Sequence, residues 1–147
     1  MKPAVMLLLF LLPALAVSER GPRAHVRTGA NGVPCFTVDA AADSDSTAQF
    51  RAVTVIDAMT RATMWQMALP GGRSFALVPT ICVPYAGRVA ALPQTPAAAL
   101  VAGRTYRVAL EMHNGDVRQT VTADFCVVGQ AHTVHALPTG ENCPPGN

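Results

Sequence analysis

The sequence predicts an all-β fold: an antiparallel β-sandwich of the immunoglobulin or fibronectin type III kind, with about seven or eight strands. Two observations support this. Short runs with apolar residues at every second position recur between Gly, Pro and Asn turns, and no segment of helical periodicity exceeds two turns. Four cysteines predict that the fold is stabilised by disulfides. A small barrel is the alternative architecture.

The first half of the chain is expected to form four strands. Residues 24–28 make a short edge strand, and residues 34–38 alternate as a strand after a Gly-Ala-Asn-Gly turn. Residues 50–57 are β-branched in their middle and form a hairpin with residues 63–69. Trp65, in the second strand of this hairpin, is expected to have a structural role.

The middle of the chain is less regular. Residues 73–78 follow a Pro-Gly-Gly turn as a strand, and residues 81–83 resume the extended run after Pro79. Residues 86–99 are rich in Ala and form a long connection for a sandwich, and long structured loops often hold binding sites. The end of this stretch, at 97–101, admits a short helix.

A hairpin over residues 105–128 is the strongest local prediction. Its first strand follows Leu100 and Gly103 and begins near Tyr106, a pattern typical of a tyrosine corner, in which the phenol bonds back to the upstream main chain. Tyr106 is therefore expected to be structural. Asn-Gly-Asp at 114–116 favours a tight turn. A last edge strand is expected over 132–137.

The N-terminus predicts a secretory signal peptide over residues 1–18. Lys2 precedes an apolar run at 4–12 that is too short to span a membrane, and small-x-small cleavage sites follow. The predicted plan continues with a leader and edge strand at 19–32, a sandwich domain at 33–138 and a tail at 139–147. The mature protein is expected in the periplasm or outside the cell, without a membrane span. No Cys stands at the cleavage site, so lipid anchoring is not supported.

The charge of the chain argues against nucleic acid and anionic membranes as partners. Lys2 is the single Lys, so removal of residues 1–18 leaves ten Arg against nine acidic residues, a net charge of about +1 without a basic stripe. A protein or a small molecule is the expected kind of partner.

All four cysteines, Cys35, Cys82, Cys126 and Cys143, lie in the exported part, and their even number predicts two disulfides. Three pairings exist, and the sequence alone does not choose among them. We expect Cys35 with Cys82, which would join two strands, and Cys126 with Cys143, which would pin the tail to the sheet.

No catalytic residue, metal ligand or cofactor is assigned from the sequence. It contains no Gly-x-Ser-x-Gly elbow, phosphate loop or Cys-x-x-Cys. Asp43 and Asp45 lack the Gly and closing Glu of a calcium loop, and His132 and His135 fall on opposite faces of a strand. A copper site is likewise not expected from the methionines near Trp65, at positions 59, 64 and 67, because Met64 and Met67 fall on opposite strand faces.

The partner-binding surface is predicted at residues 85–99 and the Arg side chains near them. The residues assigned to it are Tyr85, Arg88, Arg104 and Arg107. Arg107 points away from the face of Tyr106, so it lies on the outer surface, where it would meet an acidic partner or keep the sheet soluble.

Several short motifs occur in a recognisable order: Pro-Cys-Phe-Thr-Val at 34–38, Trp65 on a hairpin, Cys-Val-Pro-Tyr at 82–85, Leu-Val-Ala-Gly-Arg-Thr-Tyr-Arg-Val at 100–108 and Asp-Phe-Cys at 124–126. In this order the chain resembles a family of small bacterial periplasmic lipoproteins described as immunity proteins of type VI secretion systems. Those relatives carry a lipid-attachment Cys after the signal, where this chain has Ala-Val-Ser-Glu at 16–19.

The resemblance implies a non-catalytic protein that binds and blocks a toxin delivered to the periplasm. It also favours pairing Cys35 with Cys82, because both match the family's cysteine positions. The competing classes are a secreted or periplasmic structural or adhesion domain, such as an assembly component, and a hydrolase whose site is assembled from scattered residues.

Overall fold

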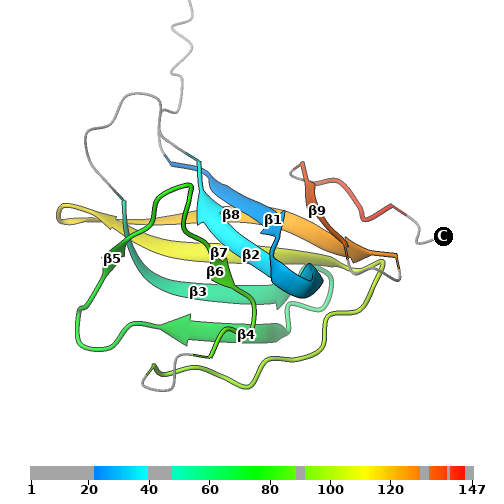
Figure 1. The fold of residues 1–147 in the computed structure, drawn as a ribbon, viewed down its shortest axis with the longest axis horizontal. Coiled ribbons are helices and arrows are strands. Elements are labelled where there is room, and N and C mark those ends of the chain that lie inside the picture. The colour runs from blue at the N-terminus through cyan, green and yellow to red at the C-terminus, as the bar shows by residue number, and fades with distance from the viewer. Residues whose placement is uncertain (1–21, 40–47, 89–91, 130–132, 139, 145–147) are drawn as a thin grey trace, which may run out of the picture.

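The computed structural model describes residues 22–39, 48–88, 92–129, 133–138 and 140–144. The predicted signal peptide, the aspartates at 43 and 45, and His132 lie outside these ranges. Two antiparallel sheets pack face to face as the predicted disulfide-stabilised β-sandwich (Figure 1). The structure has nine described strands, against the seven or eight expected, and two of them, β5 and β6, are only two residues long.

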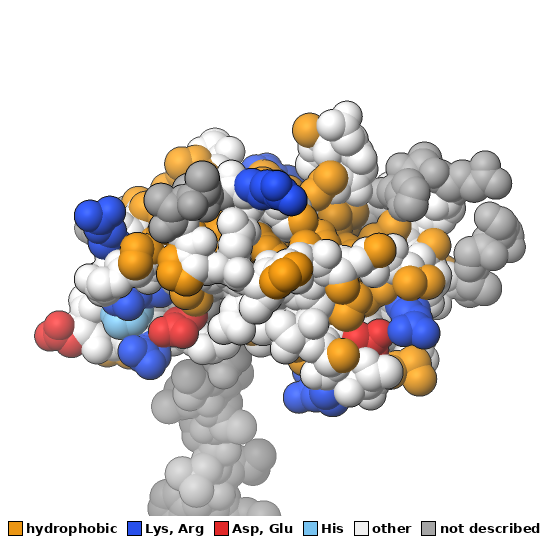
Figure 2. Space-filling view, turned by 90° about the horizontal axis from the view of Figure 1, so that it is seen from below, with side chains coloured by type: hydrophobic (Ala, Val, Ile, Leu, Met, Phe, Trp, Pro, Cys, Tyr) orange, Lys and Arg blue, Asp and Glu red, His pale blue; other side chains and the backbone are white. Residues whose placement is uncertain are grey.

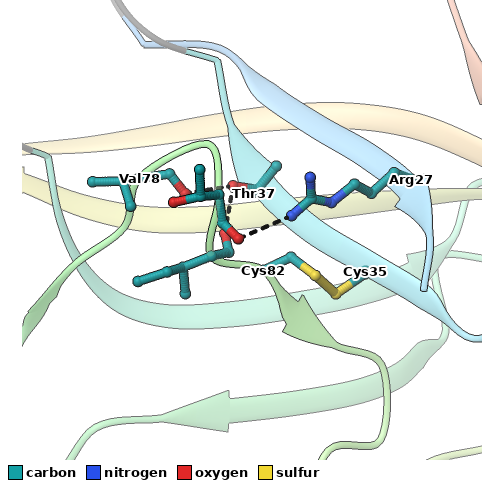
Figure 3. The surroundings of a disulfide bond; sticks show 7 residues. Arg27, Cys35, Thr37, Val78 and Cys82 are labelled. Atoms are coloured by element: carbon teal, nitrogen blue, oxygen red, sulfur yellow. Dashed lines mark hydrogen bonds between the residues drawn. A yellow bond between two sulfur atoms is a disulfide. The ribbon is translucent and has the colours of Figure 1, made fainter. Parts of the chain in front are cut away.

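The smaller sheet has the order β1-β2-β6, with β1 at Ala24–Thr28, β2 at Pro34–Val38 and β6 at Val83–Pro84. A single 3-10 turn, η1 at Ala30–Gly32, joins β1 to β2. The Cys35–Cys82 disulfide ties β2 to the chain just before β6 (Figure 3).

Thr37 fixes the same approach to β6. Its hydroxyl lies 2.6 Å from the carbonyl oxygen of Ile81 and 3.1 Å from that of Val78, and it is buried. The guanidinium of Arg27 donates to the carbonyl of Thr80, so β1 and β2 hold this irregular segment from two directions (Figure 3).

The larger sheet has the order β4-β3-β7-β8-β9, and the short β5 also pairs with β3. Its strands are β3 at Gln49–Asp57, β4 at Thr63–Ala68, β5 at Phe75–Ala76, β7 at Thr105–Asn114, β8 at Val117–Val128 and β9 at Thr133–Leu137. Both predicted hairpins, β3–β4 and β7–β8, are confirmed. In each hairpin the two strands pair with each other as neighbours in this sheet.

The strand predicted over 73–78 is wrong in length, because β5 keeps only two residues. Gly71 and Gly72 both have positive φ, and Arg73 donates its N–H to the carbonyl of Pro70. The start of the expected strand therefore belongs to the turn. Pro79, which has no N–H, interrupts its far end.

The core lies between the two sheets and follows the period of two. On β7, Tyr106, Val108, Leu110 and Met112 are buried, as predicted, while the residues between them are partly exposed. Aromatic side chains fill the middle of the core; those fully buried are Trp65, Tyr106, Phe36, Phe50 and Phe125.

Two further contacts close the sandwich near its C-terminus. Val134 on β9 donates its main-chain N–H to the hydroxyl of Thr28 on β1 at 3.1 Å, which bridges the edges of the two sheets. The Cys126–Cys143 disulfide pins the tail to β8, and the N–H of Cys143 bonds the hydroxyl of Thr105. Both disulfides therefore have the expected pairing. Among the described residues there is no helix whose length and apolar character suit a membrane crossing.

Candidate protein-binding surface

Residues 92–100 run along the edge of β4 that faces away from β3. Main-chain N–H groups of Ala68 and Thr95 bond the carbonyls of Pro93 and Gln66, and the N–H of Ala98 bonds the carbonyl of Met64 at 2.8 Å. The hydroxyl of Thr95 also accepts the N–H of Gln66. This pairing is antiparallel in direction, so the segment covers the sheet edge as an irregular strand would.

The short helix admitted at 97–101 is therefore absent. The main-chain N–H of Ala98 bonds a carbonyl of β4 and not one of its own segment. Pro93 and Pro96 hold the residues before them extended. The sequence signal for this was the pair of prolines three apart, which favours extended backbone more strongly than the alanines favour helix.

Tyr85 anchors this segment from the side of the smaller sheet. Its side chain is buried against Trp65, with the two ring centres 5.4 Å apart, and its hydroxyl lies 2.7 Å from the carbonyl oxygen of Ala98 and 3.1 Å from that of Met64. Burial, with a smaller effect from Tyr106, raises the pKa of Tyr85 to about 12. The phenol is therefore a hydrogen-bond donor at neutral pH and not a base.

Two grooves flank the segment. The first, of about 410 Å³, is lined mostly by apolar groups from 31–34, Tyr85, 97–100 and Val127. The second, of about 670 Å³, is lined by Trp65, Arg88 and 94–97, and Ala86 and Ala97 line both. Figure 2 views this side of the molecule, which lies at the bottom of Figure 1, and shows hydrophobic side chains gathered across its middle.

We call residues 85–88 and 92–101, with the two grooves, the β4-edge surface. It exposes small apolar groups over most of its length, including Ala86, Pro96, Ala97 and Ala99, and Val101 is 51% exposed. Its floor holds the chain's single tryptophan, whose indole Nε1 is buried and has no hydrogen-bond partner among the described residues. Such a surface suits the binding of another apolar surface.

Two of the four residues assigned to partner binding, Tyr85 and Arg88, belong to the β4-edge surface. Tyr85 is buried and its hydroxyl is engaged, whereas Arg88 is exposed at the rim of the second groove. Both assignments remain predictions.

Arg104 and Arg107 are bound to carboxylates of their own chain. Arg104 Nη1 lies 3.2 Å from Asp57 Oδ2. Arg107 binds Asp124 on the neighbouring strand with two hydrogen bonds of 2.6 and 2.8 Å, and this pairing raises the pKa of the guanidinium. Asp124 is almost fully buried, so Arg107 first serves to neutralise it, a role that the alternation of the strand does not reveal.

The histidine, cysteine and carboxylate side chains of the described ranges form no group of three that could hold a metal ion. The methionines near Trp65 differ in environment: Met67 is buried, Met64 is partly buried, and Met59 is 88% exposed on the β3–β4 turn. Comparison with known proteins finds no protein family, curated protein or solved structure that matches the chain.

Proposed function

We propose that this protein is an exported, non-catalytic binding protein of the periplasm that neutralises a secreted toxin by covering its active site. The observation that supports this proposal is the β4-edge surface, an apolar and grooved surface held on a disulfide-linked sandwich. Contiguous apolar patches on the outside of a domain mark protein interfaces more often than chance.

Hydrogen bonds hold the surface in place, and this favours tight binding. Its segment 92–100 is hydrogen-bonded to β4, and the hydroxyl of Tyr85 ties it to the smaller sheet, so little main-chain entropy remains to be lost when a partner docks. Arg88 at the rim provides one positive charge, which would meet an acidic residue of the toxin.

Export supports the same function. The predicted signal peptide directs the chain out of the cytoplasm, and two disulfides suit an oxidising compartment. Mass spectrometry of the mature protein, isolated from the periplasm, tests this part: cleavage after residue 18 or close to it, no lipid and two disulfides are expected.

A genetic and a binding experiment test the function itself. Deletion of the gene should reduce viability, and deletion of a neighbouring toxin gene should restore it. The purified protein should form a stoichiometric complex with that toxin. Viability that does not depend on any toxin, or failure of the two purified proteins to associate, would contradict the proposal.

Charge reversal locates the interface. Arg88→Glu should weaken the complex at least tenfold, while the matched change Arg73→Glu, on an exposed turn outside the β4-edge surface, should leave affinity unchanged. Because the chain has one tryptophan, 5-fluorotryptophan labelling gives a single ¹⁹F resonance from Trp65, which should shift on complex formation. Equal effects of the two reversals would place the interface elsewhere.

A further inference from the structure

β8 is longer than its outer neighbour. β9 pairs with it only from Asp124 to Val128, and Pro138 follows the last paired residue, Leu137, without an N–H to continue the ladder (Figure 1). Within the described part of the chain, residues 117–123 therefore pair with β7 on one side, and no strand is hydrogen-bonded to them on the other.

The direction of the free main-chain groups follows from the alternation of the ladder. Val127 accepts the N–H of Gly103, which lies on the β7 side of β8, so odd-numbered residues of β8 turn their main-chain groups toward β7. Arg118, Thr120 and Thr122 consequently present theirs to the open edge. Their side chains are exposed on the outer face of the sheet.

Among the described residues, two other edges of the sandwich have partners. Residues 93–98 cover β4, and the edge of β1 meets β9 through Thr28 and Val134. Natural edges are otherwise blocked by Pro, Lys or a bulge. Residues 117–123 contain no Pro or Lys, their register with β7 is regular, and Arg118 is paired with Glu111 at 3.3 Å.

A groove of about 760 Å³ lies beside this edge. Residues 119–124 form one side of it, 22–24 form another, and Leu137 and Pro138 also line it. Its volume falls within the range of natural ligand sites. Val121 and Ala24 offer apolar contacts inside the groove, and Arg23 is exposed beside them.

A second copy of this chain does not fit the edge. Two copies related by a twofold axis would pair their β8 edges with each other. A continuous sheet would then require even-numbered residues of one copy to pair with even-numbered residues of the other, because these carry the main-chain groups at the open edge. Centring the pairing on Thr120 or Gln119 would drive the second copy's β7–β8 turn against Leu137 or Pro138, which border Asp124 and Ala123. Centring it on Arg118 would oppose like charges.

We propose that this groove is a strand-addition site that binds one extended segment of a partner protein through its main chain. The segment places apolar side chains toward Val121 and an acidic side chain near Arg23. β8 and β4 lie toward opposite edges of the larger sheet, so this site is separate from the β4-edge surface and does not depend on the proposed toxin.

Hydrogen exchange of the oxidised, unliganded protein tests the open edge. Amides of Arg118, Thr120 and Thr122 should exchange at least tenfold faster than those of Gln119, Val121 and Ala123, which bond β7. Equal protection of both sets would overturn the proposal.

Peptide binding tests the ligand class. The probe is a capped synthetic heptapeptide, Thr-Val-Thr-Glu-Thr-Val-Thr, whose Val and Glu side chains share one strand face, with two derivatives N-methylated at alternate residues. The parent should shift the ¹⁵N–¹H signals of Arg118, Thr120 and Thr122, and one derivative should lose at least tenfold in affinity while the other binds like the parent. No shift at millimolar peptide, or equal affinity of both derivatives, would overturn the proposal. The protein is unaltered in this experiment, so misfolding of a variant cannot confuse the result. As a separate control, the Arg88→Glu variant should bind the peptide as the parent protein does.

Discussion

The main-chain N–H of Val101 donates a hydrogen bond of 2.7 Å to the hydroxyl of Tyr106, five residues further along the chain. The ring of Tyr106 is fully buried, 5.7 Å from that of Phe125, so the hydroxyl is held in place by the core. Gly103, between the two, has φ of 79° and bonds the carbonyl of Val127. This corner connects the end of the β4-edge surface to the start of β7.

Tyr106→Phe removes that bond and keeps the ring. The free energy of unfolding should fall by about 1–2 kcal/mol, because the N–H of Val101 loses its acceptor and regains only water. Urea denaturation measures the change, and the slope of the transition should stay as in the parent protein. An unaltered midpoint would mean that the corner contributes no stability.

The two disulfides should contribute unequally. By the chain-entropy estimate, Cys35–Cys82, whose partners are 47 positions apart, stabilises the fold by about 4 kcal/mol, and Cys126–Cys143, whose partners are 17 positions apart, by about 3 kcal/mol. The double variants Cys35→Ala/Cys82→Ala and Cys126→Ala/Cys143→Ala, compared by urea denaturation, should follow that order. The reverse order would indicate that the tail contributes more than chain entropy.

Asp57 should add stability that disappears in acid. Its carboxylate accepts hydrogen bonds from the N–H groups of Thr60 and Met59, both at 2.9 Å, and from the guanidinium of Arg104. These bonds lower the pKa of Asp57 below the ordinary 3.8, and the bond from the Thr60 N–H has the largest effect. A folded-state pKa below the unfolded one gives stability that is present above about pH 4 and is lost as the pH falls through the folded value.

Asp57→Asn should therefore lower stability at pH 7 and flatten its decline below about pH 4. Thermal unfolding between pH 2 and 7 measures this dependence. The matched change Asp116→Asn, at an exposed turn position, should leave the curve as it is. An acid limb as steep in Asp57→Asn as in the parent would assign the loss of stability to other carboxylates.

The sequence predicted what depends on local pattern. The alternation in β7 placed Tyr106 and Leu110 in the core, and the Asn-Gly turn set the register of β8. The pairing of Arg107 with Asp124 was not predicted, because it joins residues 17 positions apart and depends on the register across two strands. The path of 92–100 along β4 was missed for the same reason: it is set by bonds to a distant edge and not by local preference.

Tyr85→Phe should loosen the β4-edge surface without unfolding the domain. The phenol is the donor that holds the carbonyl of Ala98, and its pKa of about 12 keeps it protonated throughout the neutral range. Without it, the N–H of Ala98, which bonds Met64, should exchange with solvent at least fivefold faster, while the amide of Val108 in the central strand β7 should not change. Hydrogen exchange followed by NMR measures both amides in one sample. Faster exchange at both positions would indicate global destabilisation, and unchanged exchange at Ala98 would show that the segment is held by β4 alone.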